Sequence, residues 1–183
     1  MSHTCGCFVL KRGLESVPQK VFLPLLRRYL EILKRRLGED LIAVILYGSL
    51  ARGEAELHKS DIDLYVVAKR WPRFFNHRFE ILEDVFKELE ATQEYREALS
   101  KELHVSFSEY PLTIEEALRH GPLDLEVYAD GIVLYDREGF AERKFSELES
   151  RLKRIGAQQK DVGKRKRLWI LKPKVKFSEV IEV

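Results

Sequence analysis

The sequence has little cysteine and no long hydrophobic run, and both absences narrow the class of protein. Its 183 residues include two cysteines, Cys5 and Cys7, which cannot form the disulfide framework of a small secreted domain. With His3 they would give a soft metal one ligand fewer than a tetrahedral site needs, so we expect an ordinary terminus. No apolar stretch approaches the roughly 20 residues of a membrane helix, and a signal-peptide pattern is missing. We therefore expect a cytoplasmic protein without membrane contact.

Asparagine is nearly absent while charged residues are abundant. Asn76 is the only asparagine, 34% of the residues are charged and 45% are hydrophobic. This composition indicates a folded protein with a sizeable core, and the excess of Lys, Arg and Glu is typical of heat-adapted proteins. The net charge of +2 is unevenly distributed, because residues 80–126 are mainly acidic and residues 151–176 mainly basic. The two parts therefore favour different partners.

The densest group of chemically useful residues lies between two apolar runs, 41–47 and 62–68. Both runs are rich in Val, Ile, Leu and Tyr without polar alternation, which predicts strands buried on both faces of a sheet. Gly48 and Ser49 follow the first run, where the backbone can turn and the first N–H groups of a short helix can bind phosphate. Arg52 adds a cation one helical turn later.

Asp61 and Asp63, at the start of the second run, are the candidate metal ligands. In an extended strand, residues two positions apart point to the same face, so the two carboxylates lie side by side. Their mutual repulsion favours a divalent cation between them, and a pair of Mg²⁺ ions activates in-line displacement at phosphorus. A structural alternative stays open, in which Asp61 caps a neighbouring backbone group.

This order of residues, Gly48-Ser49-x-x-Arg52-Gly53 and then Ser60-Asp61-x-Asp63, resembles the signature of the DNA polymerase β-like nucleotidyltransferase superfamily, in its small minimal type. The resemblance implies an α/β (α+β) fold with a mixed β-sheet flanked by helices. It also implies transfer of a nucleoside monophosphate from an NTP, by preference ATP, to an acceptor hydroxyl with Mg²⁺ or Mn²⁺. By the same resemblance, Asp61 and Asp63 are catalytic and bind the metal, and the nucleotide-binding residues are Gly48, Ser49, Arg52 and Ser60.

The third carboxylate that active relatives usually have is missing from the pattern. It would lie on the next strand, which apolar alternation predicts at 103–107. The matching positions are His104 and Ser106, so His104 and the nearby Glu109 are the candidate substitutes. A second function follows as an alternative: a catalytically impaired nucleotide-binding protein of this fold. It would act, as relatives in toxin–antitoxin modules do, as the partner of a separate helical protein.

Helical periodicity accounts for much of the remaining chain. Apolar residues recur at helical spacing in 21–37, 75–89 and 141–155, which predicts amphipathic helices packed on the sheet. Thr113 and Glu116 have the spacing of a capping box and predict the start of another short helix.

We expect a nucleotidyltransferase domain over residues 18–136 and an extension over 137–183 that packs on the same domain. The extension holds a basic loop, which either contacts nucleic acid or an acidic partner, or is merely solvated. Its four consecutive cations are Lys164, Arg165, Lys166 and Arg167.

Overall fold

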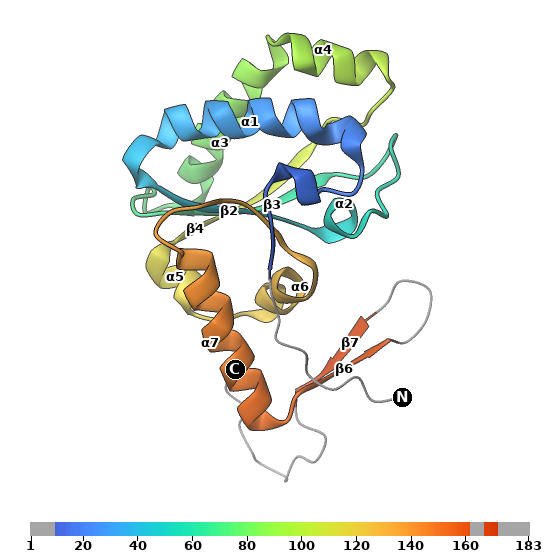
Figure 1. Cartoon of the computed structure of the whole chain (residues 1–183). Helices are drawn as coiled ribbons and strands as arrows, with labels where there is room; N and C mark the ends of the chain where they lie inside the picture. Colours follow the sequence, from blue (N-terminus) through green and yellow to red (C-terminus); the bar gives the residue numbers. More distant parts are fainter. Residues whose placement is uncertain (1–9, 162–166, 172–183) are drawn as a thin grey trace.

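The structure is a computed structural model that describes residues 10–161 and 167–171, and a mixed β-sheet lies at its centre (Figure 1). The strands of this sheet are β1 (Lys11–Arg12), β2 (Leu41–Tyr47), β3 (Ile62–Ala68), β4 (Phe107–Thr113) and β5 (Ile132–Asp136). They lie in the order β1-β5-β2-β3-β4, with β2 antiparallel to β3 and β5, and with β4 parallel to β3. This mixed sheet between layers of helices confirms the predicted fold class.

One group of helices covers the upper face of the sheet in Figure 1. It consists of α1 (Leu23–Leu37), α3 (Phe75–Glu90) and α4 (Gln93–Ser100), with the short 3-10 helices η1 (Leu14–Ser16), η2 (Lys20–Phe22) and η3 (Gly38–Asp40) beside α1. Helix α1 lies within the predicted range 21–37 and ends at its last residue. Pro24 lies in its first turn and Gly38 follows its end, positions that these residues favour. Arg35 of α1 pairs with Glu88 of α3, so part of the basic face of α1 joins two helices.

A second group of helices covers the opposite face of the sheet. It consists of α5 (Ile114–Leu118), α6 (Pro122–Asp130) and α7 (Phe140–Ile155). Thr113 and Glu116 form the predicted capping box at the start of α5. The short helix α2 (Gly48–Arg52) follows β2, and a separate antiparallel hairpin of β6 (Gln158–Asp161) and β7 (Arg167–Ile170) follows α7.

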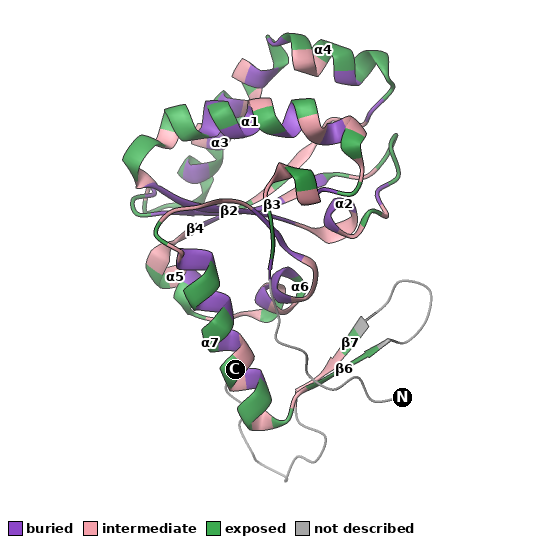
Figure 2. Ribbon diagram, in the orientation of Figure 1, coloured by how far each residue is buried: buried purple, intermediate pink, exposed green. Residues whose placement is uncertain are grey.

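Two hydrophobic clusters, one on each face of the sheet, hold these layers together. The first contains Leu64 and Val66 of β3 with side chains of α1, α3 and α4. The second contains Tyr65 and Val67 of β3 with side chains of α5, α6 and α7. Because alternate side chains of β3 enter opposite clusters, the strand is buried on both faces, as predicted (Figure 2). Asp63 alternates with Leu64 and therefore lies on the face of the second cluster.

The predicted strand at 103–107 is wrong, because β4 begins at Phe107 and ends at Thr113. The alternation that predicted the strand has another cause: Leu103 and Val105 pack on the first cluster from a loop. Pro111 is an unusual residue for a strand, since proline cannot donate a hydrogen bond within a sheet. Among the described residues β4 is an edge strand, where one missing N–H group costs little.

Some sequence predictions fall on other parts of the chain. Cys5, Cys7 and the run 164–166 lie outside the described residues. Trp169 of β7 contacts Tyr128 of α6 with a ring separation of 6.0 Å, so the hairpin is attached to the second cluster. Within the described ranges no helix combines the length and the apolar character that crossing a bilayer requires.

Candidate active site

Strands β2 and β3 bring the two halves of the sequence motif to one end of the sheet. Tyr47, the last residue of β2, lies directly opposite Asp63. Paired residues in an antiparallel ladder share a face, so the Tyr47 ring and the Asp63 carboxylate both lie on the side of α6 and α7. Asp61 directly precedes β3, and its negative charge contributes to the raised pKa of Asp63. The spacing of the motif therefore does bring the two carboxylates together.

Gly48 is required at the end of β2 for two reasons. Its φ angle is +71°, a left-handed backbone conformation that side chains disfavour. In addition, a Cβ atom at this position would lie 2.1 Å from Oδ2 of Asp63. The glycine thus lets the aspartate of one strand lie against the backbone turn that follows the other strand.

The pKa of Asp63 is raised from 3.8 to about 6, mainly by burial. The negative charges of Asp61 and Glu126 contribute to this rise, and Arg52 opposes it. Desolvation and like charges both disfavour the ionised carboxylate, so the site carries negative charge that the surrounding protein does not fully balance. A carboxylate in this state is suited to binding a cation.

Arg52 and Ser49 lie on α2, beside the turn at Gly48. The Nε group of Arg52 donates to Glu54 over 3.0 Å, and a terminal guanidinium nitrogen lies 3.8 Å from Asp130 at the end of α6. These contacts fix the guanidinium near the two aspartates. Within the described part of the chain, the Ser49 hydroxyl has no hydrogen-bond partner, although the Ser49 carbonyl accepts from the Glu54 amide.

Ser60 and His104 lie next to Asp61. The Ser60 hydroxyl accepts a hydrogen bond of 2.9 Å from the amide of Glu56, which closes the turn before β3. Nε2 of His104 lies 3.2 Å from Oδ1 of Asp61, because the loop before β4 passes beside the start of β3. The structure therefore brings His104, one of the two candidate substitutes for the third carboxylate, to the aspartate pair.

Glu109, the other candidate substitute, lies on the opposite face of the sheet. It is paired in register with Leu64, and its carboxylate accepts a hydrogen bond of 2.7 Å from the Tyr29 hydroxyl of α1. The residue of β4 in register with Asp63 is Ser108. Strand β4 therefore places no carboxylate beside Asp63.

This geometry agrees with comparisons to known proteins. A family model described as "Nucleotidyltransferase domain" matches residues 26–128. A protein of Methanocaldococcus jannaschii named "Putative protein adenylyltransferase MJ1305" is 31% identical over 141 residues, which cover 75% of this chain and 87% of that protein. The chain belongs to the nucleotidyltransferase domain family. The predicted resemblance to minimal nucleotidyltransferases is thereby confirmed, and nucleotidyl transfer is the activity that this membership supports.

Two matches among solved structures are crystal structures of toxin–antitoxin proteins. One, a crystal structure of a toxin–antitoxin with AMP-PNP, has a TM-score of 0.44 and 18% sequence identity, and the match covers 71% of this chain and 91% of the other. A double mutant of the toxin–antitoxin MntA-HpeT has a TM-score of 0.42 and 15% identity, with the same coverage.

Glu126 is a charged neighbour of this candidate site that the sequence did not reveal. Helix α6 is attached near both ends: Asp124 accepts a hydrogen bond of 3.0 Å from Tyr65, two residues after Asp63, and Asp130 faces Arg52. Glu126 lies between these contacts. Burial is the main cause of the raised pKa values of Asp63, about 6, and Tyr47, about 12, and the negative charge of Glu126 adds to both. More than sixty positions separate Glu126 from the motif, and no spacing rule connects them.

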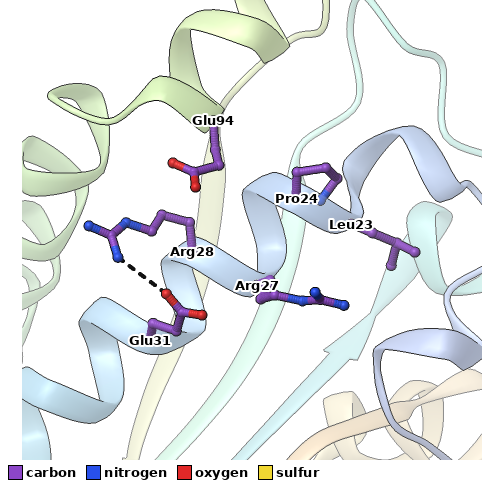
Figure 3. A pocket seen from close by; sticks show the side chains of 6 residues that line it. All are labelled: Leu23, Pro24, Arg27, Arg28, Glu31 and Glu94. Atoms are coloured by element: carbon purple, nitrogen blue, oxygen red, sulfur yellow. Dashed lines mark hydrogen bonds and ion pairs between the residues drawn. The ribbon is translucent and has the colours of Figure 1, made fainter.

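A shallow pocket on the other side of the sheet is distinct from this site (Figure 3). It has a volume of about 250 Å³ and is lined by residues of α1 together with Glu94 of α4. Arg28 and Glu31, which line it, form an ion pair of 3.2 Å with each other. Helix α1 packs on the face opposite Asp63, so this pocket does not serve the aspartate pair.

Replacing Gly48 with alanine is expected to destabilise the protein by about 1–3 kcal/mol and to weaken ATP binding. The new methyl group would displace the Asp63 carboxylate, and the backbone would stay in a strained conformation. Urea denaturation and ATP titration measure the two effects. Gly121→Ala is the matched control, because Gly121 has a negative φ angle and open space around it. Wild-type stability and ATP affinity in Gly48→Ala would contradict this account of the turn.

Proposed function

We propose that this protein transfers AMP from ATP to a hydroxyl group of an acceptor protein. The observation that carries the proposal is the contact of Asp63 with the turn at Gly48, with Asp61 beside it. The name of the Methanocaldococcus relative, a putative protein adenylyltransferase, supports AMP as the transferred group and a protein as the acceptor. The activity class, nucleotidyl transfer, is that of the family to which the chain belongs.

The triphosphate of ATP would lie at the start of α2. The first N–H groups of a helix have no partner within the helix, and Gly48 opens α2 without a side chain that would keep phosphate away. The Ser49 hydroxyl adds a donor. Arg52, held by Glu54 and Asp130, would reduce the negative charge on this side of the site.

A divalent metal ion is usual in the family, and the residues present fit Mg²⁺. Within residues 10–161 and 167–171, no group of three or more His, Cys, Asp or Glu side chains is arranged to hold one metal ion. Mg²⁺ does not need such a group, because it is commonly bound through one or two carboxylates together with phosphate oxygens and water. Asp61 and Asp63 would hold the ion, which would neutralise charge on the phosphate undergoing transfer.

The reaction forms one bond and breaks another at the α-phosphorus of ATP. The acceptor oxygen bonds to this phosphorus, the bond to the bridging oxygen of the β-phosphate breaks, and pyrophosphate leaves. The hydroxyl proton passes to solvent. Asp61 and Asp63 orient the two reactants. Strand β4 provides no carboxylate beside this pair, and the ring nitrogen of His104 next to Asp61 takes its place in orienting the acceptor hydroxyl.

A second candidate function is nucleotide binding without turnover, in a complex with a separate helical protein. One observation favours it: Ser108 is the β4 residue next to Asp63. In this case the metal and ATP would still bind, but the acceptor oxygen would not be positioned.

Labelled ATP separates these functions. Wild-type protein with Mg²⁺ and ATP carrying label on the α-phosphate should label peptides that contain tyrosine, serine or threonine, and mass spectrometry should show one added AMP. Label on the γ-phosphate should remain in pyrophosphate. Transfer of the γ-label would contradict nucleotidyl transfer. Binding of ATP without any labelling would favour the second candidate.

A further inference from the structure

A small aromatic patch is exposed at the edge of the sheet beside the proposed active site. It consists of Phe75 and Phe79 of α3, which are 44% and 40% exposed, and Tyr110 of β4, which is 40% exposed. The ring centroids of Phe75 and Phe79 are 5.2 Å apart, and those of Phe75 and Tyr110 are 6.3 Å apart. Within the described residues, none of the three belongs to either core cluster. Contacting aromatic side chains at a surface are typical of binding sites.

The patch is continuous with the face of the sheet that carries Asp63. Ser108 is in register with Asp63, and Tyr110 follows it by two residues on the same face of β4. The Tyr110 ring lies 6.2 Å from the ring of Tyr65, which is the neighbour of Asp63 on that face. Tyr110 also contributes to the raised pKa of Tyr47, the residue opposite Asp63. A molecule that reaches Asp63 along β4 therefore passes over Phe75 and then Tyr110.

The patch rests on a rigid support. Arg78 lies beneath the Phe75 ring with its guanidinium carbon 5.3 Å from the ring centre. Arg78 is buried and donates to both carboxylate oxygens of Glu116 and to the carbonyl of Pro111. These bonds leave little freedom to the base of the patch. They also exclude pairing of an added strand at Pro111, which lacks an N–H group and whose carbonyl is already occupied.

The size of the patch decides between a stable dimer and a transient partner. With about 200 Å² per aromatic side chain, the exposed fractions correspond to roughly 250 Å². A stable interface needs about 800 Å² from each partner, so a second copy of the chain held by this patch alone would not form a lasting dimer. An area of this size fits one or two apolar side chains of a substrate that binds briefly and leaves.

We propose that the patch of Phe75, Phe79 and Tyr110 binds an apolar side chain of the acceptor protein, close in sequence to the hydroxyl that receives AMP. This inference rests on the proposed function, because it assumes an acceptor hydroxyl at Asp61 and Asp63. One diagonal step between neighbouring strands, about 8 Å from Asp63 to Tyr110, and the ring contact of 6.3 Å between Tyr110 and Phe75 separate Asp63 from Phe75, which is about 14 Å in all. An extended chain covers this distance in about four residues. The acceptor therefore carries a large apolar residue about four positions from the modified residue.

Synthetic peptides test the inference. Each contains a single tyrosine, and phenylalanine or serine stands four residues away on either side. Wild-type protein should modify one phenylalanine peptide with kcat/KM about tenfold or more above its serine counterpart, as the burial of an aromatic side chain predicts. In the variant Phe75→Ala/Phe79→Ala this ratio should fall to about one. Leu99→Ala is the matched control, since Leu99 is an exposed apolar residue of α4, and it should keep the wild-type ratio.

The outcomes separate this inference from the proposed function. Equal kcat/KM for phenylalanine and serine peptides, or a preference that survives Phe75→Ala/Phe79→Ala, would overturn the inference while AMP transfer stands. If no peptide is modified, fluorescence anisotropy of the same labelled peptides decides. Tighter binding of a phenylalanine peptide to wild type than to the double variant would support the patch and count against AMP transfer. The absence of such a difference would overturn the inference as well.

Discussion

The variant Asp63→Asn is expected to lose AMP transfer on the order of 10³-fold while its apo form unfolds no more easily than wild type. Asparagine keeps the shape of the side chain against Gly48 but removes the charge that would hold Mg²⁺. In wild type, Mg²⁺ and ATP together should raise the melting temperature, because ligands that bind the native state stabilise it. In Asp63→Asn this rise should be absent.

The pH dependence of unfolding gives an independent measure of the same charge. The pKa of Asp63 is about 6 in the folded protein, against an ordinary value of 3.8 for an exposed aspartate. Between these values the folded state holds more protons than the unfolded state, so apo wild type loses stability as the pH rises from about 4 to 6. Asp63→Asn lacks this loss. Above pH 6 its free energy of unfolding should exceed that of wild type by about 1 kcal/mol, after allowance for solvent screening at this half-buried group.

The same substitution at an aspartate outside the candidate site provides the control for Asp63→Asn. Asp84 of α3 is half-exposed and forms an ion pair with Arg36 of α1 on the opposite side of the sheet. Asp84→Asn should retain AMP transfer and the response to Mg²⁺ and ATP. A wild type whose melting temperature ignores Mg²⁺ with ATP, or an Asp63→Asn variant that transfers AMP normally, would contradict the proposed role of the aspartate pair.

The central part of the fold was predictable because its signals are local. Strands β2 and β3 have the predicted bounds, since a run of β-branched and aliphatic residues buried on both faces has few other structures open to it. The positions of Gly48, Asp61 and Asp63 follow from those strands, because the turn and the two-residue spacing fix which side chains share a face. The sequence signals for helix ends were equally local, as the capping box at Thr113 shows.

The parts that were missed depend on contacts between distant segments. Strand β4 contains Pro111, and whether proline is tolerated there depends on β4 lying at the sheet edge. Glu109 and His104 are five residues apart in sequence. The register of β4 places Glu109 against Tyr29, and the path of the preceding loop places His104 against Asp61. Glu126 comes near Asp63 only because α6 packs on the sheet. The short sequence of α6 has no clear apolar face from which this packing could be predicted.

A buried ionic network beneath α6 was also absent from the sequence prediction. Lys144 of α7 is fully buried and lies 2.9 Å from Oδ1 of Asp124. Asp124 also accepts hydrogen bonds from the Tyr65 hydroxyl and from the amide of Gly121. Lys144 in addition donates to the carbonyl of Ala117 and faces Nδ1 of His120 at 3.4 Å. Each charge in the network is therefore surrounded by hydrogen-bond partners.

The variant Lys144→Ala is expected to lower the free energy of unfolding by about 3–5 kcal/mol, because it leaves the Asp124 carboxylate buried without its cation. Urea denaturation measures this loss. Lys153→Ala in the same helix is the control, since Lys153 is half-exposed and its ion pair with Glu149 should be worth less than about 0.5 kcal/mol.

The double variant Asp124→Asn/Lys144→Met shows whether the unpaired buried charge causes the loss of stability in Lys144→Ala. It removes both charges and keeps similar volumes, and buried ion pairs replaced in this way often cost little or nothing. Its free energy of unfolding should therefore recover to within about 1–2 kcal/mol of wild type. A loss in the double variant as large as that of Lys144→Ala would mean that the altered hydrogen bonds of the network, and not the unpaired charge, cause the destabilisation. A Lys144→Ala variant as stable as Lys153→Ala would show that Asp124 does not depend on Lys144.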